Sequence, residues 1–164
     1  MRIPIAIVVF LALGTSSFTQ APQAPQARQA PQAPSPGSPA TYKSAEALAA
    51  ALKIAKPTEG GMTTSNVATT DQYGINIVHR AKPAGAVAHA GNTELHYIIE
   101  GSGTVITGGT LVRGATAGSA TIANGVTQHV SKGDVVIVPA NSPHWYSQID
   151  SEITYLEVRW LAPK

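Results

Sequence analysis

The chain has 164 residues, enough for one domain and hardly for two. Charged residues make up 12% and aromatic residues 5%, so the fold must be stabilised by aliphatic packing rather than by networks of surface ion pairs. The 11 basic and 9 acidic residues give a formal charge of +2, and the basic residues are scattered, which argues against a nucleic-acid partner. Because cysteine is absent, disulfides and thiolate metal sites are excluded, and a metal would need imidazole and carboxylate ligands.

The N-terminus has the layout of a secretory signal peptide. Arg2 is followed by an apolar run, Ile3 to Leu13, and then by small residues, Gly14 to Ser17. The apolar run is short for a membrane span. We therefore expect residues 1–20 to be removed and the protein to be exported, periplasmic or secreted, with no membrane span left after cleavage. An uncleaved N-terminal anchor is the alternative.

Residues 21–40 repeat Ala-Pro-Gln and Ala-Pro-Ser variants and contain no large apolar residue. A segment of this composition cannot bury a core, so we expect a disordered spacer biased toward polyproline II. A recognition role for the proline-rich segment is the alternative to a plain tether. Residues 41–164 are then expected to form the folded domain.

The best helix candidate runs from Ser44 to Lys56. Its serine can cap the helix, alanine and leucine dominate, and the proline that follows Lys56 ends it. Leu48, Leu52 and Ala55 fall on one side at helical spacing. We expect that side to lie across the barrel that the following segments predict.

After Thr58, short runs rich in valine, isoleucine and threonine alternate with glycine, proline and asparagine turns. This texture is typical of an all-β sandwich or barrel. Gly108-Gly109 predicts a tight hairpin turn, and residues 114–120 predict a surface loop. The predicted strands are Met62–Ala68, Tyr73–Arg80, Ala86–His89, Glu94–Glu100, Thr104–Thr107, Gly109–Arg113, Ala120–Ile122, Val135–Pro139, His144–Gln148 and Glu152–Trp160.

Side chains of metal-ligand character occur in three stretches: His89, then Glu94 and His96, then His144. Residues two apart in a strand share a face, so Glu94 and His96 point the same way. An ionised carboxylate on the inner face of a buried strand is costly unless a cation compensates it. A divalent metal ion would provide that compensation.

These residues lie in a pattern that resembles the two cupin motifs. His89-Ala-Gly-Asn-Thr-Glu94, followed by six residues and Gly101, is similar to the first motif from its second histidine onward. The stretch from Gly133 to Pro139, followed by His144, is similar to the second motif. The resemblance implies a double-stranded β-helix, or jelly-roll barrel, with one short N-terminal helix.

The sequence departs from the second motif at Asn141, where a glycine is usual, and from the first at Val87 and Ala81. Val87 replaces the first histidine of the His-x-His pair, and Ala81 stands in place of the leading glycine. Our hypothesis is that His96 supplies the missing ligand, because it adds an inward imidazole one strand step from Glu94.

The resemblance thus implies a divalent metal ion (iron, manganese, nickel or zinc) held by His89, Glu94 and His144, and our hypothesis adds His96 as the fourth ligand. Without His96, the other three residues still form a two-histidine, one-carboxylate set that leaves coordination positions open. Tyr146 shares the strand parity of His144. Tyr146 and His96 are the candidate catalytic residues, and Tyr146 would act as an acid or a hydrogen-bond donor.

Function stays open at the level of sequence, because the resemblance implies several chemistries. The first hypothesis is a small metalloenzyme of the dioxygenase, lyase, isomerase or decarboxylase type. Its substrate would be a small organic molecule in a pocket lined by Val87, Ile98 and Tyr146. The alternatives are a non-catalytic module that binds a small molecule or a metal, and a metal-independent sugar isomerase or epimerase.

A homodimer is also expected. The strand Glu94–Glu100 is apolar on its outer face too, through Leu95, Tyr97 and Ile99. Either other elements of the chain or a second subunit must cover such a face.

Overall fold

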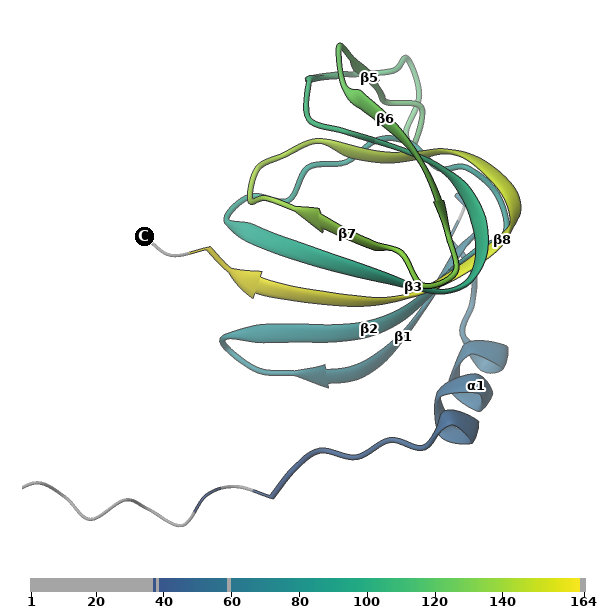
Figure 1. Cartoon of the computed structure of the whole chain (residues 1–164), viewed down its shortest axis with the longest axis vertical. Helices are drawn as coiled ribbons and strands as arrows, with labels where there is room; N and C mark the ends of the chain where they lie inside the picture. The colour runs from purple at the N-terminus through teal and green to yellow at the C-terminus, as the bar shows by residue number, and fades with distance from the viewer. Residues whose placement is uncertain (1–36, 38, 59, 163–164) are drawn as a thin grey trace, which may run out of the picture. The chain divides into compact units, whose positions relative to one another are not determined.

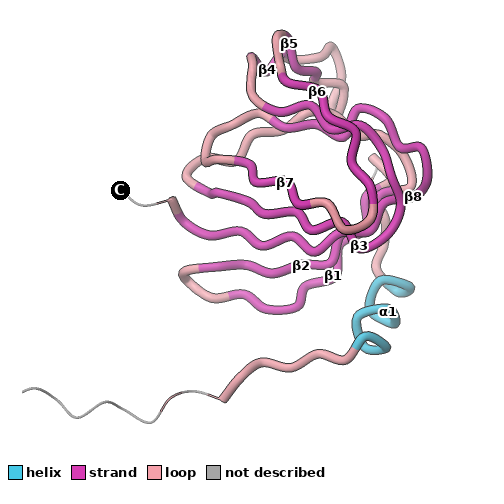
Figure 2. Tube along the Cα trace, in the orientation of Figure 1, coloured by secondary structure: helices cyan, strands magenta, loops and turns pink. Residues whose placement is uncertain are grey.

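The computed structural model describes residues 37, 39–58 and 60–162, which are mostly β with one short helix, as predicted (Figures 1 and 2). The predicted signal peptide and nearly all of the predicted spacer lie outside the described residues. No helix in the described part is long and apolar enough to cross a membrane. The elements are α1 (Ala45–Ile54), β1 (Met62–Thr69), β2 (Tyr73–Arg80), β3 (Asn92–Thr107), β4 (Thr110–Val112), β5 (Thr121–Ala123), β6 (Val126–Ser131), β7 (Val135–Val138) and β8 (His144–Leu161).

Most of the strands form one antiparallel sheet in the order β1-β2-β8-β3-β6, with β7 paired to β3, while β4 and β5 form a separate pair. The two longest strands, β3 and β8, pair along their lengths with four register shifts. Register shifts of this kind are β-bulges, which bend a strand and increase its twist. Both strands therefore curve, and the sheet curls round into a barrel (Figure 2).

The bend in β3 requires a glycine. Gly101 has a φ of +83°, and a Cβ at this position would overlap the carbonyl oxygen of Glu152 on β8. The sequence predicted two separate strands on either side of this glycine. The structure instead joins them into β3 and also joins His144–Gln148 and Glu152–Trp160 into β8, because bulges let a strand turn a corner without ending.

Three local predictions differ from the structure. The predicted strand Ala86–His89 is reduced to an isolated bridge between Val87 and His144. The polar strand β6 was not predicted, because all of its residues except Val130 are exposed and the period-2 signal is weak. The two glycines of Gly108-Gly109 have positive φ as a tight turn requires, but they connect β3 to β4, which do not pair with each other.

The inner face of the sheet forms the core, with Ile98, Val105 and Ile153 fully buried at its centre. The helix α1 lies on the outer face, as expected. Leu48 and Leu52 line an apolar space together with Ile77 of β2. The helix begins where predicted, and the side chain of Ser44 accepts a hydrogen bond from the amide of Ala47 at 3.2 Å.

Candidate metal centre

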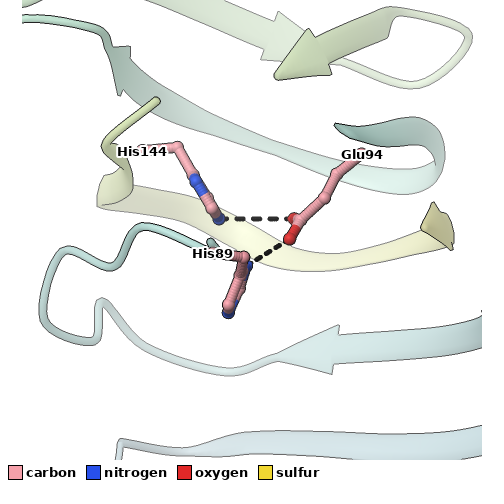
Figure 3. A group of neighbouring side chains, drawn as sticks. All are labelled: His89, Glu94 and His144. Carbon is pink, nitrogen blue, oxygen red and sulfur yellow. Dashed lines mark hydrogen bonds and ion pairs between the residues drawn. The ribbon is translucent and has the colours of Figure 1, made fainter. Parts of the chain in front are cut away.

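Three segments of the chain bring His89, Glu94 and His144 together (Figure 3). Glu94 points inward from β3, and His144 begins β8. The loop that carries His89 is tied to the loop before β8, because the amide of Asn141 donates to the carbonyl of His89 at 3.1 Å. Asn141 has a φ of +65°, a left-handed conformation that asparagine tolerates, so it can replace a glycine there.

The side chains of these three residues converge on one point inside the barrel. The Nε2 atom of His144 lies 3.4 Å from Oε2 of Glu94, and Nδ1 of His89 contacts Oε1 of the same carboxylate. One ligand atom from each residue can be chosen so that all three lie within 4.8 Å of one another. The described residues therefore include a group with the donor atoms and the spacing that a metal ion needs.

Glu94 is ionised although its exposed fraction is only 1%. Burial alone would raise the pKa of its carboxyl, but hydrogen bonds from His89 and His96 outweigh that effect. The positive charge of Arg159 acts in the same direction, and together these partners hold the pKa well below its usual range.

His144 presents an unprotonated nitrogen to that carboxylate. Burial lowers the pKa of His144 to about 4, so the ring is neutral at pH 7. Its Nδ1 lies 3.3 Å from the carbonyl oxygen of Ser142, which can only accept a hydrogen bond. The hydrogen-bond pattern therefore assigns the ring proton to Nδ1 and leaves a lone pair on Nε2, facing the Glu94 oxygen. Both atoms could donate to a metal ion placed between them.

A second group of potential ligands consists of Glu94, His96 and Glu157. Here a cation is already present, because Nη2 of Arg159 lies 3.0 Å from Oε2 of Glu157. Asn76 also donates to Oε1 of Glu157 at 3.0 Å. Since a guanidinium and an amide already compensate Glu157, the first group is the better candidate for a metal ion.

His96 lies between these groups and is fully buried. Its Nδ1 lies 3.1 Å from the hydroxyl of Tyr146, and its Nε2 lies 3.2 Å from Oε2 of Glu94. Burial raises the pKa of Tyr146 strongly, so its phenol stays protonated and can donate to Nδ1. The Nε2 proton then points to Glu94, an arrangement that orients the carboxylate.

The structure therefore does not bring all four predicted ligands into one group. Among the described residues, the group that contains His89 and His144 does not include His96. The ligand role of His96 and the catalytic role of Tyr146 both stay predictions.

A cavity of about 120 Å³ opens beside the candidate centre. Of the three residues predicted to line a pocket, Val87 lines this one, whereas Ile98 and Tyr146 lie in the core. The cavity is lined by Thr58, Met62, Arg80, Ala84, Gly85, Val87, His89, His144, Tyr155, Glu157 and Arg159.

Sequence reasoning missed several of these polar residues. A signal for two of them was present. Ile153, Tyr155, Glu157 and Arg159 lie at every second position of β8, so all four face the same side of the sheet. In the register with β3, Glu157 pairs with His96 and Arg159 pairs with Glu94.

Comparisons with known proteins agree with this architecture. The model of the cupin family matches residues 46–155. Among solved structures, TT1209 from Thermus thermophilus is 16% identical, with a TM-score of 0.52 over 76% of this chain and 100% of that chain. The cupin domain of Cnp3 from Schizosaccharomyces pombe is 11% identical (TM-score 0.49, 68% of this chain and 72% of that one).

A predicted oxalate decarboxylase from Thermotoga maritima is 16% identical (TM-score 0.47, 62% of this chain and 81% of that one). No curated protein matches the sequence. At these identities the structural neighbours show the fold alone, while the family model covers most of the barrel. The resemblance in the sequence is thus confirmed, and the chain belongs to the cupin family.

Proposed function

We propose that this cupin binds one divalent transition-metal ion through His89, Glu94 and His144 and acts as a small metal-dependent enzyme. One observation carries the proposal: a nitrogen of His89, a nitrogen of His144 and an oxygen of the buried carboxylate of Glu94 lie within 4.8 Å of one another. A divalent cation bound between them would compensate the buried carboxylate.

The donor set fits such an ion. Two imidazoles and one carboxylate suit iron(II), manganese, nickel and zinc, and three protein ligands leave coordination positions open for a substrate. When bound, the ion would supply Lewis-acid activation of a substrate oxygen or a site for O₂ chemistry.

The residues of this chain would prepare the site for that chemistry. Hydrogen bonds and charges keep Glu94 ionised, and Ser142 keeps the proton of His144 away from the centre. His89 is half-buried and lines the cavity, so a substrate can reach the centre from that side. Reactions of the dioxygenase, lyase, isomerase or decarboxylase type are compatible with this arrangement.

The second candidate function is a non-catalytic module that binds a metal or a small molecule. It is favoured because two polar side chains that line the cavity, Tyr155 and Glu157, are poor proton acceptors. Burial raises the pKa of Tyr155 to about 12, so its phenol stays protonated. Glu157 is already engaged by Arg159 and Asn76. Neither side chain can readily accept a proton from a substrate.

Metal content tests the proposal. The full-length protein, purified after expression with iron, manganese, nickel and zinc supplied, is expected to contain about one equivalent of metal by elemental analysis. Both Glu94→Gln and His144→Ala should lose it, because each removes a ligand, an effect larger than the 10–100-fold loss typical of an outer-shell partner. The matched control is His129→Ala, since His129 is exposed and pairs with Asp150 away from the cavity. Wild-type protein without metal, or variants that retain it, would overturn the proposal.

We also propose that the protein is exported, on the basis of Arg2 and the apolar run from Ile3 to Leu13. Fractionation of the native host should find the mature protein, shortened at its N-terminus, outside the cytoplasm. Full-length protein confined to the cytoplasm would exclude export.

A further inference from the structure

The cavity beside the candidate metal centre contains two arginines, Arg80 and Arg159. Both come from strand positions that face the barrel interior, at the end of β2 and near the end of β8. The two differ in their partners. Arg159 already engages Glu157 at 3.0 Å, and its Nε lies 3.3 Å from Oε1 of Glu94 without forming a hydrogen bond.

Arg80 has a different set of neighbours. Among the described residues, no carboxylate oxygen lies within 4.0 Å of its guanidinium nitrogens. Its Nε donates to the hydroxyl of Tyr155 at 3.1 Å. Its guanidinium carbon lies 5.1 Å from the ring centroid of Tyr146 and 5.8 Å from that of Tyr155. These contacts hold the guanidinium in place, and no hydrogen bond within the described part of the chain uses its two terminal nitrogens.

The charges around the cavity favour an anion there. The carboxylates of Glu94 and Glu157 are matched by the guanidinium groups of Arg80 and Arg159. A divalent cation would add two positive charges to this buried balance. Excess charge in a poorly hydrated interior is costly, so an anionic ligand would stabilise the metal-bound state.

We infer that Arg80 is the receptor for a carboxylate group of the substrate, and that the substrate is therefore a small carboxylate anion. This inference rests on the proposed function, because the rest of the substrate would then reach the metal centre. The two terminal nitrogens of a guanidinium match the two oxygens of a carboxylate in one plane. A phosphate fits less well, because its second negative charge would face Glu157, which lines the same cavity.

The size of the cavity fits such a ligand. Its volume is about 120 Å³. A cavity of this size is large enough for a small anion such as acetate.

The test is calorimetric titration of the full-length, metal-loaded protein with acetate and with acetamide, its neutral isostere. Acetate is expected to bind at least about tenfold more tightly than acetamide, because a charge-assisted hydrogen-bond pair discriminates by that amount or more. Arg80→Met should weaken acetate binding about tenfold and leave acetamide unchanged. Arg80→Lys should recover part of the acetate affinity. The control Arg113→Met removes an exposed arginine that does not line this cavity and should change neither affinity.

Metal content, measured on the same samples, separates this inference from the proposed function. If the wild-type protein takes up no metal, the proposed function fails, and the acetate titration is repeated on the metal-free protein to test Arg80 alone. Equal binding of acetate and acetamide to the wild-type protein would overturn the inference even if Arg80→Met failed to fold. Unchanged acetate affinity in a folded Arg80→Met protein would also overturn it, as would tighter binding of inorganic phosphate than of acetate.

Discussion

Glu94 is surrounded by nitrogen atoms from four side chains: His89, His96, His144 and Arg159. They do not have the same role. The hydrogen-bond pattern gives His144 a free lone pair at Nε2, whereas His96 directs a proton to the carboxylate. In this arrangement His96 orients the carboxylate, as an outer-shell partner does, and its role as a ligand stays a prediction.

We predict that His96→Ala weakens metal affinity by about 10–100-fold, which is less than the loss in His144→Ala. The reason is that it removes a hydrogen bond to Glu94 rather than a ligand atom of the central group. His96→Gln, which keeps a donor, should recover part of the affinity. Competition with a chelator measures the affinities. Loss of metal equal to that of His144→Ala would instead establish His96 as the fourth ligand.

Gly101 is the residue on which the bend of β3 depends. Replacing it with alanine should cost more than about 3 kcal/mol of unfolding free energy, because a Cβ would add a clash with Glu152 to the strain of a positive φ. Gly133→Ala is the control, since Gly133 has a φ of +94° but open space around its Cβ position. Its cost should stay within about 1–3 kcal/mol. Similar denaturant midpoints for the two variants would contradict this explanation.

At the scale of elements, the sequence predicted most strands but not their continuity. The sequence predicted two strands separated at Gly101, because a glycine often marks the end of a strand. In the structure Gly101 instead lies at a bend within the single strand β3. The strand β6 was missed because its face to the solvent is polar and its pattern is weak. These are differences of tertiary context, which local sequence does not encode.

In the candidate site too, some residues could be predicted from local sequence and others depend on tertiary context. The motif residues His89, Glu94 and His144 could be selected by their spacing, and the structure brings them together. Arg80 could not be selected, because its place beside the centre depends on the pairing of β2 with β8. Glu157 and Arg159 could have been selected, because they lie two residues apart on the inward face of a strand. The same spacing selected Glu94 and His96, with which they pair.

The helix α1 should contribute modestly to stability. Leu52→Ala is expected to lower the unfolding free energy by about 1 kcal/mol, because this side chain is only partly buried against the outer face of the sheet. Ile54→Ala should have almost no effect, since the exposed fraction of Ile54 is 84%. Urea denaturation measures both. Equal effects would mean that α1 does not pack on the barrel through the predicted side.

At the scale of the whole molecule, an apolar area remains on the outer face where β3 pairs with β7. Tyr97 pairs with Val135, and Leu95 pairs with Ile137. The exposed fraction of Ile137 is 61%. The helix α1 packs mainly against β1 and β2, so it does not cover this apolar area. Exposed apolar areas of this kind are typical of protein interfaces.

The homodimer expected from the sequence stays a prediction, and this area is where we place its interface. Wild-type protein at micromolar concentration should give the mass of a dimer by light scattering, and Ile137→Glu should shift it to the monomer by burying a charge in the interface. Val126→Glu is the matched control, because Val126 on β6 has an exposed fraction of 63% but lies outside this area. A wild-type monomer, or equal effects of both variants, would exclude this interface.

The central claim is that one metal ion lies between His89, Glu94 and His144. Anomalous diffraction from crystals of the full-length protein loaded with manganese or zinc tests it most directly. One strong anomalous peak is expected within coordination distance of Nε2 of His144 and the carboxylate of Glu94, with His89 as the third ligand. No peak at this point, or a peak between His96 and Glu157 instead, would contradict it.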